Sequence, residues 1–121
     1  MLLPTISTTY RQGLLQRQLK HEAELVQRFD QAWVVAKQAA NWLKQQFGLK
    51  QVWIFGSLVH QQWFSPTSDI DLAVEELESD AYLTSVARLQ DLAPEFKIDL
   101  IRLDRCPPDF REAIVKEGQC L

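Results

Sequence analysis

The chain has 121 residues, which suffices for one domain with one buried core but not for two. Its hydrophobic fraction of 46% and charged fraction of 24% are ordinary for a soluble globular protein. No stretch approaches the roughly 20 apolar residues that span a bilayer, and no signal-like segment follows Met1. A net charge of -3 disfavours capture of a nucleic-acid backbone, which depends on clustered Lys and Arg. We therefore expect a cytoplasmic protein without membrane insertion or direct nucleic-acid binding.

A long amphipathic helix is predicted from Tyr10 to Phe47, as one helix or as two consecutive ones. Its apolar residues recur at steps of three and four until Gly48, a natural helix stop. The stripe includes Leu15, Leu19, Val26, Phe29, Trp33, Ala36, Ala40, Leu43 and Phe47. A single helix of that length would measure about 55 Å, whereas a globule of this size is only about 35 Å across. Part of the helix should therefore project from the body or break.

After Gly48 the pattern changes to short strands alternating with helices. Strands are predicted at 51–55, 69–74 and 97–102, a short helical turn at 58–63, and helices at 79–92 and 108–118. Pro107-Pro108 suits the start of the last helix and Gly118 its end. The sequence thus predicts an α/β or α+β domain with a small mixed sheet of about three strands.

Two acidic residues share one face of the second predicted strand. Asp69 and Asp71 are two positions apart, so their side chains point to the same side, with their backbones roughly 6 to 7 Å apart. Asp99, in the middle of the third strand, would join them if these two strands were neighbours. Two carboxylates at about 4 Å repel by roughly 4 kcal/mol at an effective dielectric of about 20, so such a cluster favours a cation or a shared proton. Mg²⁺ suits ligands that are all oxygen.

The charges around this strand also favour a metal. No Lys or Arg lies between Lys50 and Arg88, while six acidic residues do. They are Asp69, Asp71, Glu75, Glu76, Glu78 and Asp80. A polyphosphate would need divalent cations to bind in such surroundings.

Two motifs in a fixed order suggest a family. Phe55-Gly-Ser57 ends the first predicted strand, and Ser68-Asp-Ile-Asp-Leu72 opens the second. Together they resemble the signature of the DNA polymerase beta-type nucleotidyltransferase superfamily, and the short chain resembles its minimal nucleotidyltransferases. The similarity runs from Gln31 to Leu121, because 108–118 is also similar to that family's C-terminal helix.

The resemblance implies a nucleotidyltransferase fold and a metal-dependent transferase. Gly56 and Ser57 would hold the triphosphate of ATP, with backbone N–H groups and the Ser57 hydroxyl as donors. Asp69 and Asp71 would hold two Mg²⁺ ions, and Asp99 would bind the first metal and accept a proton. Residues 1–121 would then form one domain, with 1–47 as a long helical extension and 48–121 as the catalytic core.

The sequence departs from the family pattern just after Gly56-Ser57, the turn that would hold the triphosphate. Gln61 stands where many members have glycine, and Val59 where alanine is usual. A glycine would end the short helix in a left-handed conformation, so Gln61 predicts either one more helical turn or a rerouted loop. Nearby His60 is interpreted as a solvated residue, and Trp63 as a core or interface aromatic rather than a base-stacking platform.

Minimal nucleotidyltransferases resemble the antitoxins of toxin–antitoxin pairs whose partner is a helical HEPN-domain ribonuclease. That resemblance implies transfer of AMP from ATP to a tyrosine hydroxyl of the toxin. Two alternatives stay open: an antitoxin that neutralises its toxin by binding alone, and a transferase acting on a small molecule. A projecting apolar stripe must be covered by another chain, so a helical partner or a homodimer is expected through the N-terminal helix.

Overall fold

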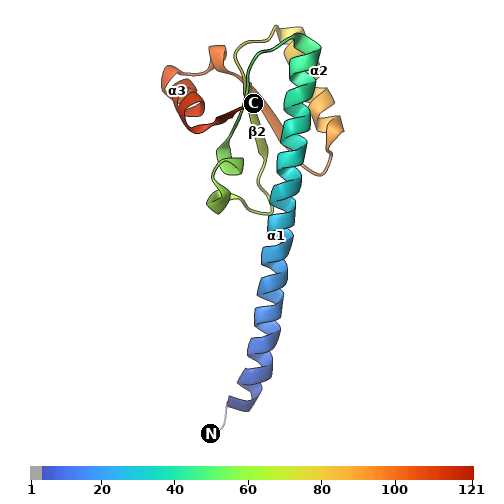
Figure 1. The fold of residues 1–121 in the computed structure, drawn as a ribbon, viewed down its shortest axis with the longest axis vertical. Coiled ribbons are helices and arrows are strands. Elements are labelled where there is room, and N and C mark those ends of the chain that lie inside the picture. The colour runs from blue at the N-terminus through green and yellow to red at the C-terminus, as the bar shows by residue number, and fades with distance from the viewer. Residues whose placement is uncertain (1–3) are drawn as a thin grey trace.

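The longest element is α1, one unbroken helix of 44 residues from Pro4 to Phe47. A helix of this length measures about 66 Å, and its N-terminal half extends far beyond the body of the molecule (Figure 1). The computed structural model describes residues 4–121, and the first three residues of the predicted 1–47 extension lie outside them. The predicted start at Tyr10 is wrong, because proline is tolerated in the first turn of a helix and allows α1 to begin at Pro4.

The predicted strands and helices of the body are present, with ends that differ by at most one residue. They are β1 (Val52–Phe55), the 3-10 turns η1 (Gly56–Leu58) and η2 (Gln61–Trp63), β2 (Ile70–Val74), α2 (Ser79–Leu92), β3 (Ile98–Arg102), the 3-10 turn η3 (Leu103–Arg105), α3 (Pro108–Glu117) and β4 (Gln119–Cys120). The predicted helical turn at 58–63 is wrong. The chain leaves helical geometry at His60 (φ −126°, ψ 79°), which separates η1 from η2.

The strands form one mixed sheet in the order β3-β2-β1-β4. β2 lies in the centre, antiparallel to β1 and parallel to β3. The α+β class, the long helix and the mixed sheet are confirmed, but the sheet has four strands rather than three.

The unpredicted strand β4 runs antiparallel to β1. Its two residues are too few to show a period of two in the sequence. The approach depends on Gly118, where a Cβ would lie 2.9 Å from the Ile54 carbonyl oxygen and 2.6 Å from that of Ile114. Gly118 thus ends α3 as predicted and also allows the chain end to reach the sheet.

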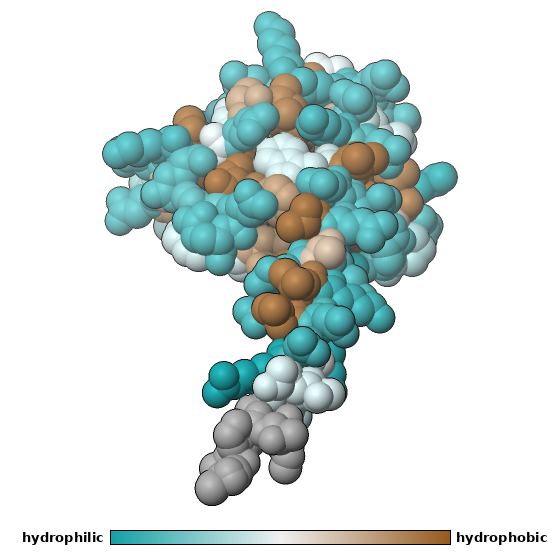
Figure 2. Space-filling model, turned by 60° about the horizontal axis from the view of Figure 1, so that its bottom comes forward, coloured by the Kyte–Doolittle hydropathy of each residue, from teal (hydrophilic) through white to brown (hydrophobic). Residues whose placement is uncertain are grey.

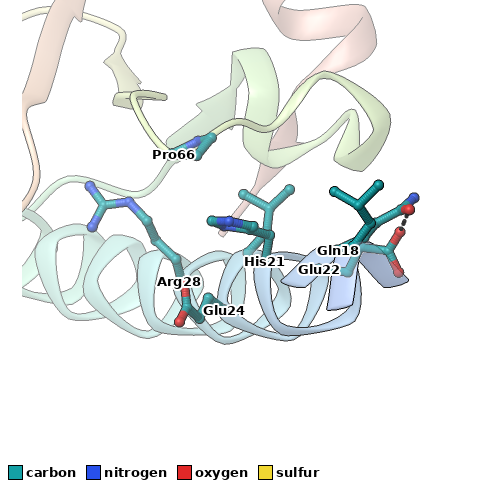
Figure 3. A pocket seen from close by; sticks show the side chains of 8 residues that line it. Gln18, His21, Glu22, Glu24, Arg28 and Pro66 are labelled. Carbon is teal, nitrogen blue, oxygen red and sulfur yellow. Dashed lines mark hydrogen bonds between the residues drawn. The ribbon is translucent and has the colours of Figure 1, made fainter. Parts of the chain in front are cut away.

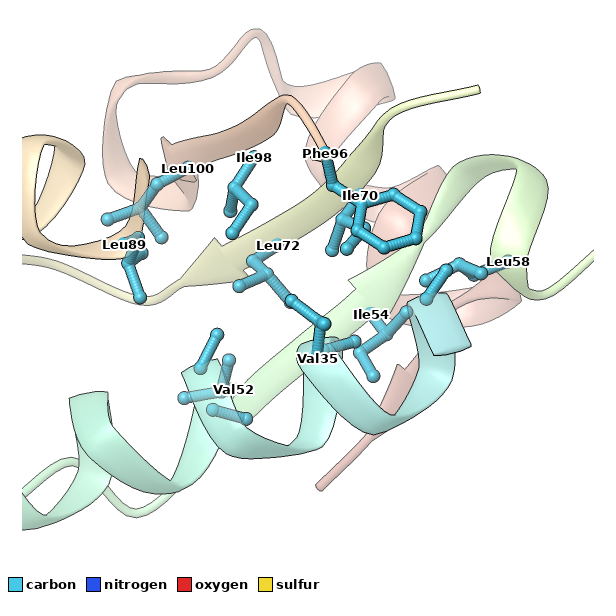
Figure 4. Packing of buried hydrophobic residues seen from close by; sticks show 14 of the residues in the cluster. Val35, Val52, Ile54, Leu58, Ile70, Leu72, Leu89, Phe96, Ile98 and Leu100 are labelled. Carbon is cyan, nitrogen blue, oxygen red and sulfur yellow. The ribbon is translucent and has the colours of Figure 1, made fainter. Parts of the chain in front are cut away.

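Alternate strand residues face opposite sides of the sheet. Ile54, Leu72 and Leu100 point toward α1 and α2 and belong to the main core (Figure 4). On the other side, Trp53 and Ala73 form a smaller cluster with residues from η3 and α3. The sheet therefore lies between α1 and α2 on one face and α3 on the other.

The C-terminal half of α1 lies close on the sheet because small side chains face it. Ala32, Ala36 and Ala39 are fully buried. Beside them, the Trp33 indole Nε1–H donates a hydrogen bond to the Leu58 carbonyl oxygen (3.1 Å), which ties α1 to the turn after β1.

Within residues 4–121, no helix is both long and apolar enough to cross a membrane.

Two leucines of α1 provide a matched test of this arrangement. Leu43 is fully buried, whereas Leu19 is 55% exposed on the projecting half. We expect Leu43→Ala to lower the free energy of unfolding by about 2 to 5 kcal/mol through the cavity it leaves. Leu19→Ala should change it by less than about 0.5 kcal/mol. Urea unfolding followed by tryptophan fluorescence measures both, and equal losses would contradict the separation of α1 into a packed half and a free half.

Candidate functional site

Three acidic side chains lie near one end of the sheet, on the α3 side. Asp71 and Asp99 are direct partners on the parallel strands β2 and β3. Neighbouring strands are about 4.8 Å apart, so the two carboxylates stand side by side. Asp69 immediately precedes β2 and, two residues from Asp71, belongs to the same face. The strand pairing that Asp99 requires is thus present.

This crowding changes the acidity of the central carboxyl group. The pKa of Asp71 is raised from 3.8 to about 6, first by burial and then by the negative charges of Asp99 and Asp69. Desolvation and like charge both disfavour the ionised form. At neutral pH the site therefore holds more negative charge than its surroundings compensate, which is a common property of ligand-binding and catalytic sites.

A single ammonium group partly offsets these charges. Lys97 Nζ lies 4.0 Å from Asp69 Oδ2 and 3.8 Å from Asp99 Oδ1, and it lowers the pKa of Asp71. The Lys97 side chain is 69% exposed, so these ion pairs contribute little stability. The stretch between Lys50 and Arg88 does lack cations, but β3 brings one from outside it. The sequence could have predicted this cation, because Lys97 stands two positions before Asp99 and so belongs to the same side of the strand.

The turn after β1 lies directly against the carboxylates. Gly56 has φ +76°, in the left-handed region that favours glycine. A Cβ on Gly56 would collide with Oδ2 of Asp71. Glycine is therefore required twice at this position, by the backbone conformation and by contact with the acidic side chain. Ser57 follows in η1 and is half-buried.

Of the two alternatives predicted from Gln61, the structure shows a rerouted loop and not a helix that is one turn longer. η1 has only three residues, and the chain at His60 breaks the helical path before η2. The loop that leads to Asp69 is held by a short turn, in which the Ser65 backbone N–H donates to Ser68 Oγ at 2.8 Å. The Ile70 N–H then donates to the Lys97 carbonyl oxygen at 2.9 Å, which joins the beginnings of β2 and β3.

The ligand chemistry of these residues suits a divalent cation, although their positions do not form a closed cage. Carboxylate oxygens are the ligands that Mg²⁺ prefers, and burial together with the charges of Asp99 and Asp69 disfavours ionised Asp71 in the absence of a cation. Across residues 4–121, however, no three Asp, Glu, His or Cys side chains stand close enough together to hold one ion. Asp69, Asp71 and Asp99 thus share one face of the sheet, and their role as metal ligands stays a prediction.

A separate cavity of 690 Å³ lies away from the carboxylates, between the projecting part of α1 and the loop before β2 (Figure 3). Leu14, His21 and Leu25 line it from α1, and Pro66 faces them from the loop. Arg28 marks the end of the anchored part of the helix, because its guanidinium stacks on the Phe96 ring at 4.3 Å.

Apolar side chains are exposed on the projecting part of α1 (Figure 2). Leu14, Leu15, Leu19 and Val26 are between 43% and 56% exposed. Leu14 lines the cavity, whereas the spacing of Leu15, Leu19 and Val26 places these three on another side of the helix. Exposed apolar residues grouped on one side of a projecting helix favour an interface.

Comparisons with known proteins gave one family match and a similar solved structure. The sequence model of the family described as "Polymerase beta, Nucleotidyltransferase" matches residues 37–121. A solved structure described as "Crystal structure of the toxin-antitoxin with AMP-PNP" is similar at 25% identity with a TM-score of 0.49, over 60% of this chain and 59% of that chain. This chain therefore spans less than two thirds of that one. No curated protein matches the sequence.

The raised pKa of Asp71 predicts a pH-dependent stability. Because the folded-state pKa of about 6 exceeds the ordinary 3.8, the folded protein binds the proton more tightly and loses stability as pH rises through this window. Asp71→Asn should therefore stabilise the metal-free protein at pH 7 by on the order of 1 to 3 kcal/mol, with no gain below pH 3.8.

Thermal unfolding in EDTA between pH 3 and pH 8 measures this effect. Asp91→Asn, at an exposed position of α2, is the matched control and should leave the melting temperature unchanged. An Asp71→Asn protein no more stable than the wild type at pH 7 would contradict a raised pKa of Asp71 in the folded protein.

Proposed function

Because the chain belongs to the polymerase beta nucleotidyltransferase family, we propose that it is an antitoxin that transfers AMP from ATP to a tyrosine hydroxyl of a HEPN ribonuclease toxin. The observation that supports transfer chemistry most directly is the pairing of Asp71 with Asp99 beside the Gly56 turn. It combines uncompensated negative charge with a close backbone approach, as a metal-bound triphosphate requires.

Each residue of the site has a role in this proposal. Asp69, Asp71 and Asp99 would hold the Mg²⁺ ions, which when bound neutralise the triphosphate and favour ionisation of the attacking hydroxyl. Gly56 and Ser57 bind phosphate oxygens through backbone N–H groups and the Ser57 hydroxyl. Asp99 accepts the tyrosine proton while the tyrosine oxygen bonds to the α-phosphorus, and pyrophosphate leaves.

The projecting half of α1 favours a protein acceptor over a small molecule. Its exposed leucines and the cavity beside Pro66 offer an apolar surface outside the carboxylate site. A helix of the toxin packing along α1 would bury this surface. The toxin would then be held on the body that carries Asp71, so that its tyrosine approaches as an intramolecular reactant.

One observation favours the second candidate, an antitoxin that neutralises its toxin by binding alone. The turn that contains Gly56 and Ser57 is a 3-10 turn of three residues instead of an α-helix. Such a turn directs fewer backbone N–H groups at a phosphate than the first turn of an α-helix does. Weak catalysis with intact binding would follow from this geometry.

Mass spectrometry of the co-expressed toxin tests transfer. We expect an adduct of one AMP on a tyrosine with the wild-type chain, and its loss with Asp69→Asn or Asp71→Asn. Asp91→Asn is the control and should keep the adduct, because its side chain is exposed on α2. Neutralisation of the toxin without any adduct would reject transfer and support binding alone.

Co-purification tests the docking surface independently of catalysis. Leu14→Asp and Leu19→Asp place charges on exposed apolar positions of α1 and should weaken toxin binding more than about tenfold. Gln16→Asp, also exposed on α1, is the matched control and should bind normally. Equal binding by all four proteins would place the interface elsewhere.

A further inference from the structure

The exposed aromatic ring of Phe110 lies on the face of the sheet that carries the carboxylates of Asp71 and Asp99. Phe55 is the cross-strand partner of Asp71, so the two side chains share one face of the sheet. The Phe110 ring packs against the Phe55 ring edge-to-face, with centroids 6.4 Å apart and planes at 87°. Phe110 nevertheless remains 48% exposed. An aromatic group so exposed is not explained by packing of the small cluster under α3 alone.

The position of Phe110 is well constrained. It occupies the first turn of α3, which begins at Pro108. The next residue, Arg111, reaches Glu75 just beyond β2, with Nη2 and Oε1 2.5 Å apart. At the other end of α3, Gly118 packs close to the Ile54 carbonyl oxygen. The ring is therefore held on a rigid element, one side chain away from the phosphate turn.

From this juxtaposition we propose that Phe110 is the stacking platform for the base of the donor nucleotide. The inference rests on the proposed nucleotide transfer and adds the residue that binds the base. With the phosphates at Gly56 and Asp71, the sugar leads the base outward past Phe55 onto Phe110. An aromatic face binds a neutral purine by stacking without adding charge to an already acidic site.

A second exposed aromatic pair follows the Gly56-Ser57 turn along the chain. The His60 and Trp63 ring centroids lie 4.1 Å apart with the planes tilted by 36°, and Trp63 is 62% exposed. The next residue, Phe64, is buried in the core on the α1 side of the sheet, where its ring centroid lies 5.2 Å from that of Phe29. Phe110 lies with the carboxylates on the α3 side, so we assign the base to Phe110, and Trp63 is the alternative that the test must separate from it.

Equilibrium dialysis of the full chain with Mg²⁺ and either ATP or inorganic tripolyphosphate tests the proposal. Phe110→Ala should raise the dissociation constant for ATP about tenfold and leave that for tripolyphosphate unchanged, since only ATP carries a base. Phe110→Trp retains a ring and should bind ATP as the wild type does. Val115→Ala, at a similarly exposed position of α3, is the control and should behave as the wild type.

Other results of this experiment would reject either the stacking role of Phe110 or nucleotide binding by the chain. Unchanged ATP affinity in Phe110→Ala overturns the stacking role, and does so most clearly if Trp63→Ala weakens ATP instead. If Phe110→Ala lowers the affinity for ATP and for tripolyphosphate equally, the stacking role is also overturned, because the substitution would then have disturbed phosphate binding as well. A wild-type chain that binds neither compound rejects nucleotide use itself, and with it the platform.

Discussion

The site depends on the register between the parallel strands β2 and β3, which places Asp71 directly beside Asp99. A shift of β3 by one residue would turn Asp99 into the core and its neighbours Ile98 and Leu100 outward. The register is specified by the residues between the acidic ones. Ile70, Leu72 and Leu100 are buried at 5% exposure or less and can lie only on the side of α1 and α2. Burial of these apolar side chains therefore holds the charged ones together.

The same arrangement is unfavourable for the charges themselves. Burial and two neighbouring carboxylates raise the pKa of Asp71, and the exposed ammonium of Lys97, which contacts Asp69 and Asp99, lowers it only in part. The core must thus supply the stability that the site lacks. Ionisation of Asp71 at neutral pH therefore lowers the stability of the folded protein. A bound cation would reverse this loss, because it relieves the repulsion between the carboxylates.

The helix α1 connects the two parts of the molecule. Its C-terminal half packs on the sheet through alanines and holds the turn after β1 through the Trp33 hydrogen bond to Leu58. Its N-terminal half has exposed leucines and ends its contacts with the body near Arg28. A partner bound to the projecting half of α1 would be rigidly joined to the turn at Gly56-Ser57, because α1 is one unbroken helix that packs against this turn.

Much of the fold follows from local patterns in the sequence. A period of three and four residues predicted α1, because burial of one helix face requires it. A run of β-forming residues predicted β1, and apolar residues alternating with aspartates predicted β2 and β3, all three to within one residue. The likeness of the Gly56-Ser57 and Asp69-Ile-Asp71 motifs to a known family indicated the nucleotidyltransferase fold, and the family match bears out that fold. The roles of Asp69, Asp71, Asp99, Gly56 and Ser57 remain predictions.

Tertiary structure decided what depends on residues distant in the chain. Only the pairing of β2 with β3 shows that Asp99 reaches Asp71 and that Lys97 stands among the acidic groups. Only the packing of α3 places Phe110 beside Phe55, and only the close approach at Gly118 allows β4 to form. Periodicity reports which face of an element is buried. It carries no information about which other element covers that face, because that choice is made by the packing of the whole chain.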